Sequence, residues 1–279
     1  MSDEVMTRTV ALPGQTGTDK DDLAPESQEG MSARHAVIAR IVIVAALLGA
    51  WEFAPVSRGI KFWLSSPSAI LSTLWGWMVD GSLWAHLGAT LSVMVIGYVI
   101  GCAVGIGLGL LFGFLPRLYR VLVPFVAAFY ALPKIALAPL FIILLGIGMS
   151  SKVALVAITV FFLLLNSTID GVRDVDRDLV QSLRLMGATR IEVLRKVLLP
   201  SALPWIFTGA RISVRYAFTA TLLAELIAAN RGLGFLIEFN SGNFNATGSY
   251  AAIVVLVAFS VTLTEILTRL QILAAARRH

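Results

Sequence analysis

The stretch from Gly81 to Pro116 contains no Asp, Glu, Lys or Arg. The hydrocarbon core of a bilayer is about 30 Å thick, and a helix of about 20 mostly apolar residues crosses it. Because a backbone in lipid must satisfy its hydrogen bonds within the protein, such a stretch folds as a helix. We therefore expect a membrane-spanning helix at about 86–114, and with it a membrane protein rather than a soluble enzyme.

The composition of the whole chain agrees with this expectation. Of its 279 residues 57% are hydrophobic and only 14% are charged, whereas about a quarter of the residues of soluble domains are charged. The 22 Lys and Arg exceed the 17 Asp and Glu; in membrane proteins such an excess marks cytoplasmic loops, so it does not indicate a nucleic-acid partner. One cysteine, Cys102, and three scattered histidines predict neither a disulfide framework nor a metal site.

Five further stretches are long and apolar enough to cross a bilayer. We predict an all-α, polytopic membrane protein with six transmembrane helices at about 36–54, 86–114, 121–145, 152–169, 205–228 and 250–273. Residues 1–35 are acidic and poor in large apolar side chains, so burial cannot offset the entropy cost of ordering them. We expect a disordered tail there, followed by a membrane domain at 36–279.

The distribution of basic residues predicts the orientation. The segment 171–200 carries six of them, and Arg277 and Arg278 lie at the end of the chain. Lys and Arg gather in the short cytoplasmic loops of membrane proteins. Since an even number of spans places both termini on one side, we expect both termini and the segment of about 171–204 in the cytoplasm.

Two short segments are expected on the opposite, outer side. Ser66-Pro67 is typical of an N-cap followed by proline at the first helical position, and apolar residues recur at helical spacing until Asp80-Gly81. This pattern predicts an amphipathic helix on the outer membrane surface. The polar stretch Asn240–Ser249 is expected to be a solvated loop or part of a docking surface.

Five glycines of the predicted second span recur at every fourth position: Gly97, Gly101, Gly105, Gly109 and Gly113. Such a row forms a groove that lets a neighbouring helix approach closely, which is a main source of helix association in lipid. The neighbour is either another helix of the same chain or a helix of a second copy, and the sequence leaves both open.

Lys134 and Arg215 fall near the middle of predicted spans, and Arg211 lies one helical turn from Arg215 on the same face. A charge at the centre of a span costs roughly 2.5–3.5 kcal/mol on insertion scales, so these side chains are expected to face protein or water. They either lend positive potential to a pathway for anions, or serve structural pairing, for example with Glu225 or a backbone carbonyl, or snorkel to the cytoplasm.

The predicted cytoplasmic segment has the pattern of a helix, a glycine turn and a second helix. Apolar residues share one face of its first arm, and Gly187 suits the left-handed conformation that ends a helix. Thr189 and Glu192 match a capping box that starts the second helix. Pro200 and Pro204 are expected to break this segment before the fifth span.

Within this segment, Gln181-Ser182-Leu183, then Gly187, then Val197-Leu198-Leu199-Pro200 resembles the EAA…G…I-x-L-P signature of bacterial ABC importer permeases. In that family the short helix before the glycine is the coupling helix, which fits a cleft on the ATP-hydrolysing subunit. Gln181 stands where the family has Glu, whereas the spacing, the glycine and the terminal Leu-Pro are kept. The resemblance implies an ATPase-coupling role for Gln181, Ser182, Leu183, Arg184, Gly187 and Pro200.

Further fragments occur in the order found in the nitrate/sulfonate/taurine/bicarbonate class of these permeases, over roughly 60–279. They include Leu145-Gly146-Ile147-Gly148, Gly209-x-Arg211 and Gly232-Leu233-Gly234. The resemblance implies a multi-pass permease of the bacterial inner membrane with a cytoplasmic ATP-binding subunit, a periplasmic solute-binding protein and a second permease copy, most simply in a homodimer. It also favours a small anion, such as a sulfonate, nitrate or a carboxylate, as the solute, although related permeases also serve pyrimidine-type vitamin precursors.

The chain has no G-x-x-x-x-G-K-[ST] phosphate loop, so we expect no cofactor here and ATP hydrolysis in a partner chain. An ion-coupled secondary transporter would instead have discontinuous helices and internal repeats, and the sequence shows no convincing repeat. A membrane-embedded enzyme would need converging polar groups at depth, and only isolated Asp170 and Cys102 occur. We therefore predict a transporter subunit without a catalytic or metal site.

Overall fold

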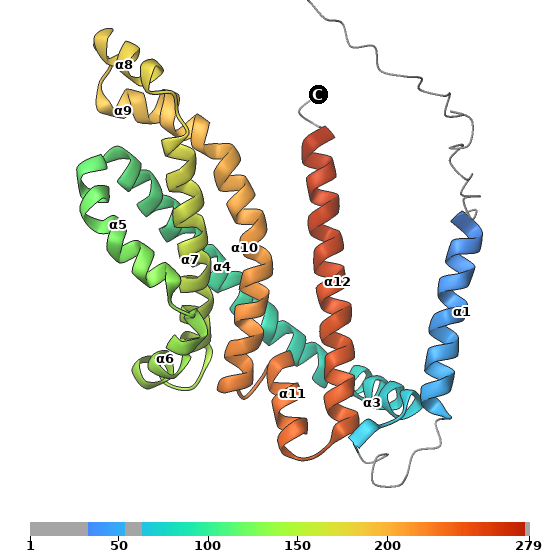
Figure 1. Ribbon diagram of the computed structural model, residues 1–279. Coiled ribbons are helices and arrows are strands. Elements are labelled where there is room, and N and C mark those ends of the chain that lie inside the picture. Colours follow the sequence, from blue (N-terminus) through green and yellow to red (C-terminus); the bar gives the residue numbers. More distant parts are fainter. Residues whose placement is uncertain (1–32, 54–62, 277–279) are drawn as a thin grey trace, which may run out of the picture. The chain divides into compact units, whose positions relative to one another are not determined.

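The computed structural model describes residues 33–53 and 63–276, and every regular element in these ranges is a helix (Figure 1). For these residues the predicted all-α class is confirmed. The elements are α1 (Ala33–Glu52), α3 (Pro67–Val79), α4 (Ser82–Phe114), α5 (Pro116–Ala131), η1 (Lys134–Leu137), α6 (Ala138–Leu145), α7 (Met149–Arg173), α8 (Arg177–Leu185), α9 (Arg190–Val193), η2 (Leu194–Leu198), α10 (Leu199–Ile227), α11 (Leu233–Gly242) and α12 (Ala246–Ala276).

The chain divides into two units, residues 1–50 and 51–279. In the first unit the predicted tail lies outside the described residues except for its last three, which open α1. Most residues of α1 are apolar, and their side chains are largely exposed. Such a helix is typical of one that lies in lipid. Helix α1 corresponds to the predicted first span, and its crossing of the membrane stays a prediction.

In the second unit four helical stretches are long and apolar enough to cross a membrane: Ser82–Phe114, Met149–Arg173, Arg190–Ile227 and Ala246–Arg269. The described residues add a fifth crossing if the bent pair Pro116–Ala131 and Lys134–Leu145 counts as one span. These five correspond in order to the predicted second to sixth spans. The predicted total of six is reached only if α1 also crosses.

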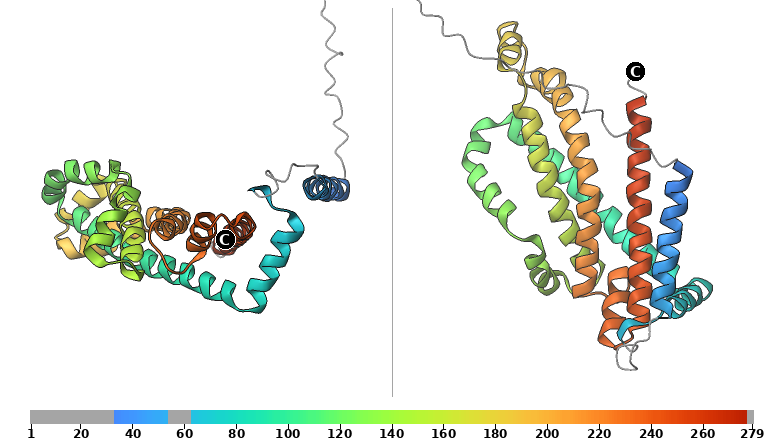
Figure 2. Two further views of the ribbon diagram at one scale, coloured as in Figure 1. Left: turned by 90° about the horizontal axis from the view of Figure 1, so that it is seen from below. Right: turned by 45° about the vertical axis from the view of Figure 1, so that its right-hand side comes forward.

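Helices α4, α7 and α10 pack against one another and form the core of this unit (Figures 1 and 2). The five-glycine row of α4 faces α7 of the same chain. A Cβ atom at Gly101 would lie 2.6 Å from the carbonyl oxygen of Ala157, and one at Gly105 would lie 2.7 Å from that of Phe161. Because backbone atoms cannot yield as a side chain does, the absence of side chains at these positions sets the distance between the two helices.

The predicted third span, 121–145, is not one helix. Helix α5 ends at Ala131, the short 3₁₀ turn η1 follows from Lys134, and the second half runs at 90° to the first. Pro133 disfavours a helical conformation of the residue before it, and Leu132 is accordingly extended, with φ −65° and ψ 134°. The prediction of a single helical span is wrong because hydropathy counts apolar residues and does not register the proline between them.

The expected break at Pro200 and Pro204 is also wrong. The chain runs from α9 through η2, which is a π-helical turn, into α10 without interruption. The N–H of Leu199 donates to the carbonyl of Leu194, five residues earlier. This widened turn accommodates Pro200, which has no N–H to donate, so that the helix continues.

Helices α3 and α11 lie at the opposite end of the unit from α8 and α9 (Figure 1). Helix α3 begins after Ser66, whose hydroxyl accepts the N–H of Ala69 at 3.4 Å, and it ends before Asp80. The helix predicted between Ser66 and Asp80 is therefore confirmed. Its place on the outer membrane surface stays a prediction.

The solvated loop expected at 240–249 is shorter than predicted: residues 241–245 are exposed, but only 243–245 lie outside α11 and α12. The side-chain amide of Asn245 donates to the side-chain oxygen of Asn240 at 2.8 Å. The oxygen of Asn245 in turn accepts the N–H of Gly248 at 3.1 Å. The asparagines thus cap the ends of two helices. The polar composition of the stretch does not reveal this role, because a solvated loop has the same composition.

Candidate functional site

The predicted coupling segment forms a helix, a turn and a second helix, as its sequence indicates. The Asp176 carboxylate accepts the N–H of Asp178 at 2.8 Å and caps the start of α8. At the other end Gly187 has a φ of +84°, and the N–H of Ala188 donates to the Leu183 carbonyl at 3.0 Å. With the bond from the Gly187 N–H back into α8, these form a Schellman motif, which requires a residue that tolerates a positive φ.

The capping box predicted at the start of α9 is present. The N–H of Thr189 donates to the Glu192 carboxylate at 2.8 Å, and the N–H of Glu192 donates to the Thr189 hydroxyl at 3.3 Å. Both sides of the turn between α8 and α9 are therefore closed by hydrogen bonds. Because α9 continues through η2 into α10, the turn joins α8 to a helix of the core.

The two faces of α8 differ in what they contact. Gln181 and Arg184 line a cleft that α8 forms with the ends of α4, α5 and α7, and Leu183 is half-buried. Away from the cleft, Leu185 is 89% exposed and Met186 is 82% exposed. Large apolar side chains gathered with such exposure are typical of an interaction surface.

The remaining predicted coupling residues lie on the exposed side or further along the chain. Ser182 is exposed one helical turn before Leu185, and Gly187 follows Met186 in the exposed turn. Pro200 is exposed in the first turn of α10. The family motif contains neither Leu185 nor Met186; the signal that could have found them is an apolar pair directly before the glycine that ends the helix.

A second candidate site lies where the third span is broken. Lys134 borders a cavity of about 190 Å³ together with Thr159 of α7 and with Tyr216 and Thr219 of α10. The Lys134 ammonium group donates to the Tyr130 carbonyl and lies 4.4 Å from the centroid of the Tyr130 ring. The bend therefore places a cation and three hydroxyl-bearing side chains around one cavity.

Arg211 and Arg215 lie on the exposed side of α10, whereas Ser213 and Ala217 on its other side are buried against the core. The hydroxyl of Thr219 donates to the Arg215 carbonyl at 3.1 Å, so Arg215 lies one turn from the Lys134 cavity, and Arg211 lies a turn further. Exposed arginines on a spanning helix require water or another protein surface beside them. The exposed side of α10 is therefore the candidate pathway surface.

Glu225 pairs with neither Lys134 nor Arg215, so that example of structural pairing is wrong, whereas the expected alternative of pairing with a backbone carbonyl is confirmed for Lys134. It is 1% exposed, and its carboxylate accepts the Thr90 hydroxyl at 3.0 Å and the Gly234 N–H at 2.9 Å. These bonds tie α10 to α4 and to the start of α11. Sequence reasoning missed this network because its members are far apart in the chain and only the fold brings them together.

Among the described residues no three His, Cys, Asp or Glu side chains gather as a metal site.

Comparison with known proteins assigns the chain to a family. Residues 103–274 match the family described as "Binding-protein-dependent transport system inner membrane component". The riboflavin transport system permease protein RibX of Chloroflexus aurantiacus is 37% identical over 223 residues, which are 80% of this chain and 83% of that protein. The taurine transport system permease protein TauC of Escherichia coli is 33% identical over 222 residues, 77% of this chain and 80% of that protein.

Comparison of the fold with solved structures indicates the same family. It is similar to a chain of the MetNI methionine ABC transporter in an inward-facing conformation, with a TM-score of 0.54 and 25% identity over 70% of this chain and 94% of that one. The broken third span is a feature that a secondary transporter would also have, but the family match covers that span and the coupling segment together. The chain therefore belongs to the binding-protein-dependent transport system inner membrane components, the permeases of ABC importers, as the motif around Gly187 predicts.

Proposed function

We propose that this chain is the permease of an importer that works as a homodimer, with six spans in each copy and both termini in the cytoplasm. In this arrangement α8 docks on a cytoplasmic ATP-binding subunit, and a periplasmic solute-binding protein delivers the solute at the opposite side. The family assignment supports the two kinds of partner. The basic residues of the segment around α8 support the orientation.

The exposed apolar tip of α8, formed by Leu185 and Met186, is the observation that carries this proposal. It ends a helix whose turn is closed by hydrogen bonds and whose continuation is α10. When ATP closes the two ATP-binding subunits, the two copies of α8 move together as rigid bodies. The movement reaches α10 and opens the surface beside Lys134 alternately to each side of the membrane.

Co-purification of the ATP-binding subunit tests the docking. The double substitution Leu185→Glu and Met186→Glu places two carboxylates on the docking surface, and we expect the complex to dissociate while the melting temperature of the permease stays unchanged. Arg195→Glu, an exposed charge change on η2, is the control and is expected to retain the subunit. Retention of the subunit by the double variant contradicts the proposed role of α8.

We propose a small anion, such as a sulfonate, nitrate or a carboxylate, as the solute. Lys134, Arg211 and Arg215 supply positive charge along the candidate pathway surface, which favours an anion there. The relation to a taurine transport permease supports this class. An aromatic solute is the second candidate, because Tyr216 offers a ring to the same cavity and a riboflavin transport permease is also a relative.

Uptake measurements with Lys134→Gln distinguish the two candidates. A charged hydrogen bond contributes about 1.5–3 kcal/mol, so its loss lowers the uptake of an anion by roughly tenfold or more. We expect this loss for taurine or nitrate, whichever the wild type transports, and no comparable loss with Arg117→Gln, a surface arginine of α5. If the wild type takes up riboflavin and neither taurine, through its sulfonate group, nor nitrate, the assignment to solutes with an anionic group is wrong.

A further inference from the structure

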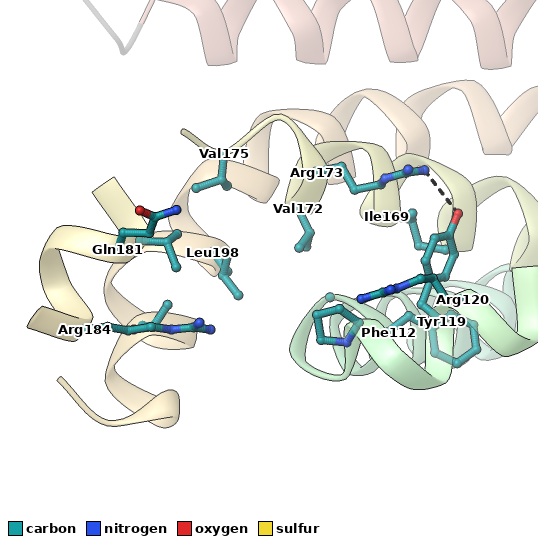
Figure 3. A pocket seen from close by; sticks show the side chains of 14 residues that line it. Phe112, Tyr119, Arg120, Ile169, Val172, Arg173, Val175, Gln181, Arg184 and Leu198 are labelled. Carbon is teal, nitrogen blue, oxygen red and sulfur yellow. Dashed lines mark hydrogen bonds between the residues drawn. The ribbon is translucent and has the colours of Figure 1, made fainter. Parts of the chain in front are cut away.

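A basic cleft lies beneath α8, on the side away from its exposed tip. Its volume is about 670 Å³, and it is bordered by the end of α4, the start of α5, the end of α7 and the inner face of α8 (Figure 3). These elements meet where the apolar spans end and the charged segment begins. In the proposed membrane arrangement the cleft therefore lies at the level of the lipid headgroups.

Three arginines line the cleft from two sides. In Figure 3, Arg184 extends from α8 on one side, and Arg120 and Arg173 lie on the other. Arg173 donates to the Tyr119 hydroxyl at 3.3 Å, and its guanidinium lies 5.3 Å from the centroid of the Tyr119 ring, so its position is set by that side chain. The opposed arginines leave space between them for a ligand.

No carboxylate compensates these charges within the cleft. Its lining contains no Asp or Glu, and the ion pairs of the described residues involve Lys196 and Arg269 but none of the three arginines. The nearby Asp174 accepts the Trp205 indole N–H at 3.2 Å, and Asp176 caps α8. Arginine stays protonated at every physiological pH, so these three exposed guanidinium groups give the cleft a positive potential that attracts an anion.

The apolar part of the lining indicates which anion fits. Phe112, Ile169 and Val172 lie against the cleft and belong to the buried ends of α4 and α7. A soluble phosphate gains nothing from an apolar wall, whereas a phospholipid places its phosphate beside its glycerol and acyl chains. Basic pockets between spanning helices at the cytoplasmic side recognise anionic headgroups in this way.

We propose that this cleft binds the phosphate of an anionic phospholipid, held between Arg184 of α8 and Arg120 and Arg173 of the membrane helices. The lipid then bridges α8 and the spans and stabilises one position of α8 relative to them. The proposal rests on the proposed function only in naming the cytoplasmic leaflet as the source. Lipid binding itself does not depend on transport.

Native mass spectrometry of the purified transporter complex in detergent tests this proposal, with phosphatidylglycerol and phosphatidylcholine added in parallel. We expect preferential retention of phosphatidylglycerol by the wild type. The variant is Arg120→Gln with Arg184→Gln, because neither side chain makes an ion pair in the described part of the chain. Each cation contributes roughly a fivefold effect near an anionic lipid, so the double variant is expected to bind it roughly 25-fold more weakly.

Arg117→Gln with Arg190→Gln is the matched control, since it removes the same charge from exposed positions outside the cleft, and we expect it to bind the lipid as the wild type does. Equal phosphatidylglycerol binding by the cleft variant and the control would overturn the proposal. Displacement of the lipid by millimolar inorganic phosphate, or by a peptide of residues 1–32 with its many carboxylates, would also overturn it. Displacement by phosphate would indicate a soluble ligand in the cleft, and displacement by the peptide would indicate that residues 1–32 of the chain itself bind there. If the cleft variant does not assemble, Arg184→Gln alone, with a fivefold expected effect, replaces it.

Discussion

Gly187 shows how one residue determines the shape of the coupling segment. Its φ of +84° lies in the left-handed region, and a Cβ atom there would meet no neighbouring atom within 4 Å. The requirement for glycine is therefore one of backbone conformation and not of space. Because the turn is local, the sequence alone predicted it, as it also predicted the Thr189 and Glu192 capping box.

We predict that Gly187→Ala weakens the turn, because an L-residue pays about 1–2 kcal/mol in the left-handed conformation. ATP-driven uptake should fall several-fold, although the permease still inserts into the membrane. Gly187→Asn is the matched control, since asparagine tolerates this conformation and should retain most of the activity. Equal activity of all three proteins, measured at equal membrane abundance, would show that the turn does not transmit force.

At the scale of the elements, the α4–α7 contact depends on the glycine row. The sequence predicted that a helix would pack there but left its identity open, since periodicity says which face is small and not what lies opposite. In the structure the neighbouring helix is α7 of the same chain. Glu225 illustrates the same limit, because Thr90 and Gly234 reach it only after α4, α10 and α11 have come together.

We predict that Gly105→Ala destabilises the permease, because its new Cβ would lie 2.7 Å from the Phe161 carbonyl oxygen. Overpacking of this kind typically costs about 1–3 kcal/mol. Gly107→Ala on the same helix is the matched control, since nothing lies within 4 Å of that position. Thermal unfolding of the two variants in detergent should show a lower melting temperature for Gly105→Ala alone. Identical melting temperatures would contradict a close contact between α4 and α7 at Gly105.

The prolines of the chain mark where sequence reasoning about elements was least accurate. Pro133 ends α5 and turns the expected third span by 90°, whereas Pro200 leaves its helix continuous through the π turn at Leu194–Leu198. The same residue type thus breaks one helix and is accommodated in another. The difference lies in whether the preceding backbone can supply alternative hydrogen bonds, which depends on the surrounding fold.

At the scale of the whole molecule, the proposed function involves three places in the second unit. We propose that the exposed tip of α8 docks on the ATP-binding subunit, that the continuous α9–η2–α10 helix carries the movement, and that the exposed side of α10 with the Lys134 cavity faces the solute. In the proposed homodimer two copies of α10 present their arginines toward a shared pathway, which supplies the water or protein that these charges require. The sequence predicted α8 through the family motif, but not its apolar tip, and it named Lys134, Arg211 and Arg215; the continuity of the helix and the cavity at the bend are visible only in the structure.

The most direct test of the central claim, that α8 couples ATP hydrolysis to transport, is solute uptake into vesicles that contain the purified permease, its ATP-binding subunit and its solute-binding protein. We predict that uptake requires ATP and all three components and that it is lost in the Leu185→Glu and Met186→Glu variant. ATP-driven uptake by that variant at the wild-type rate would contradict the claim.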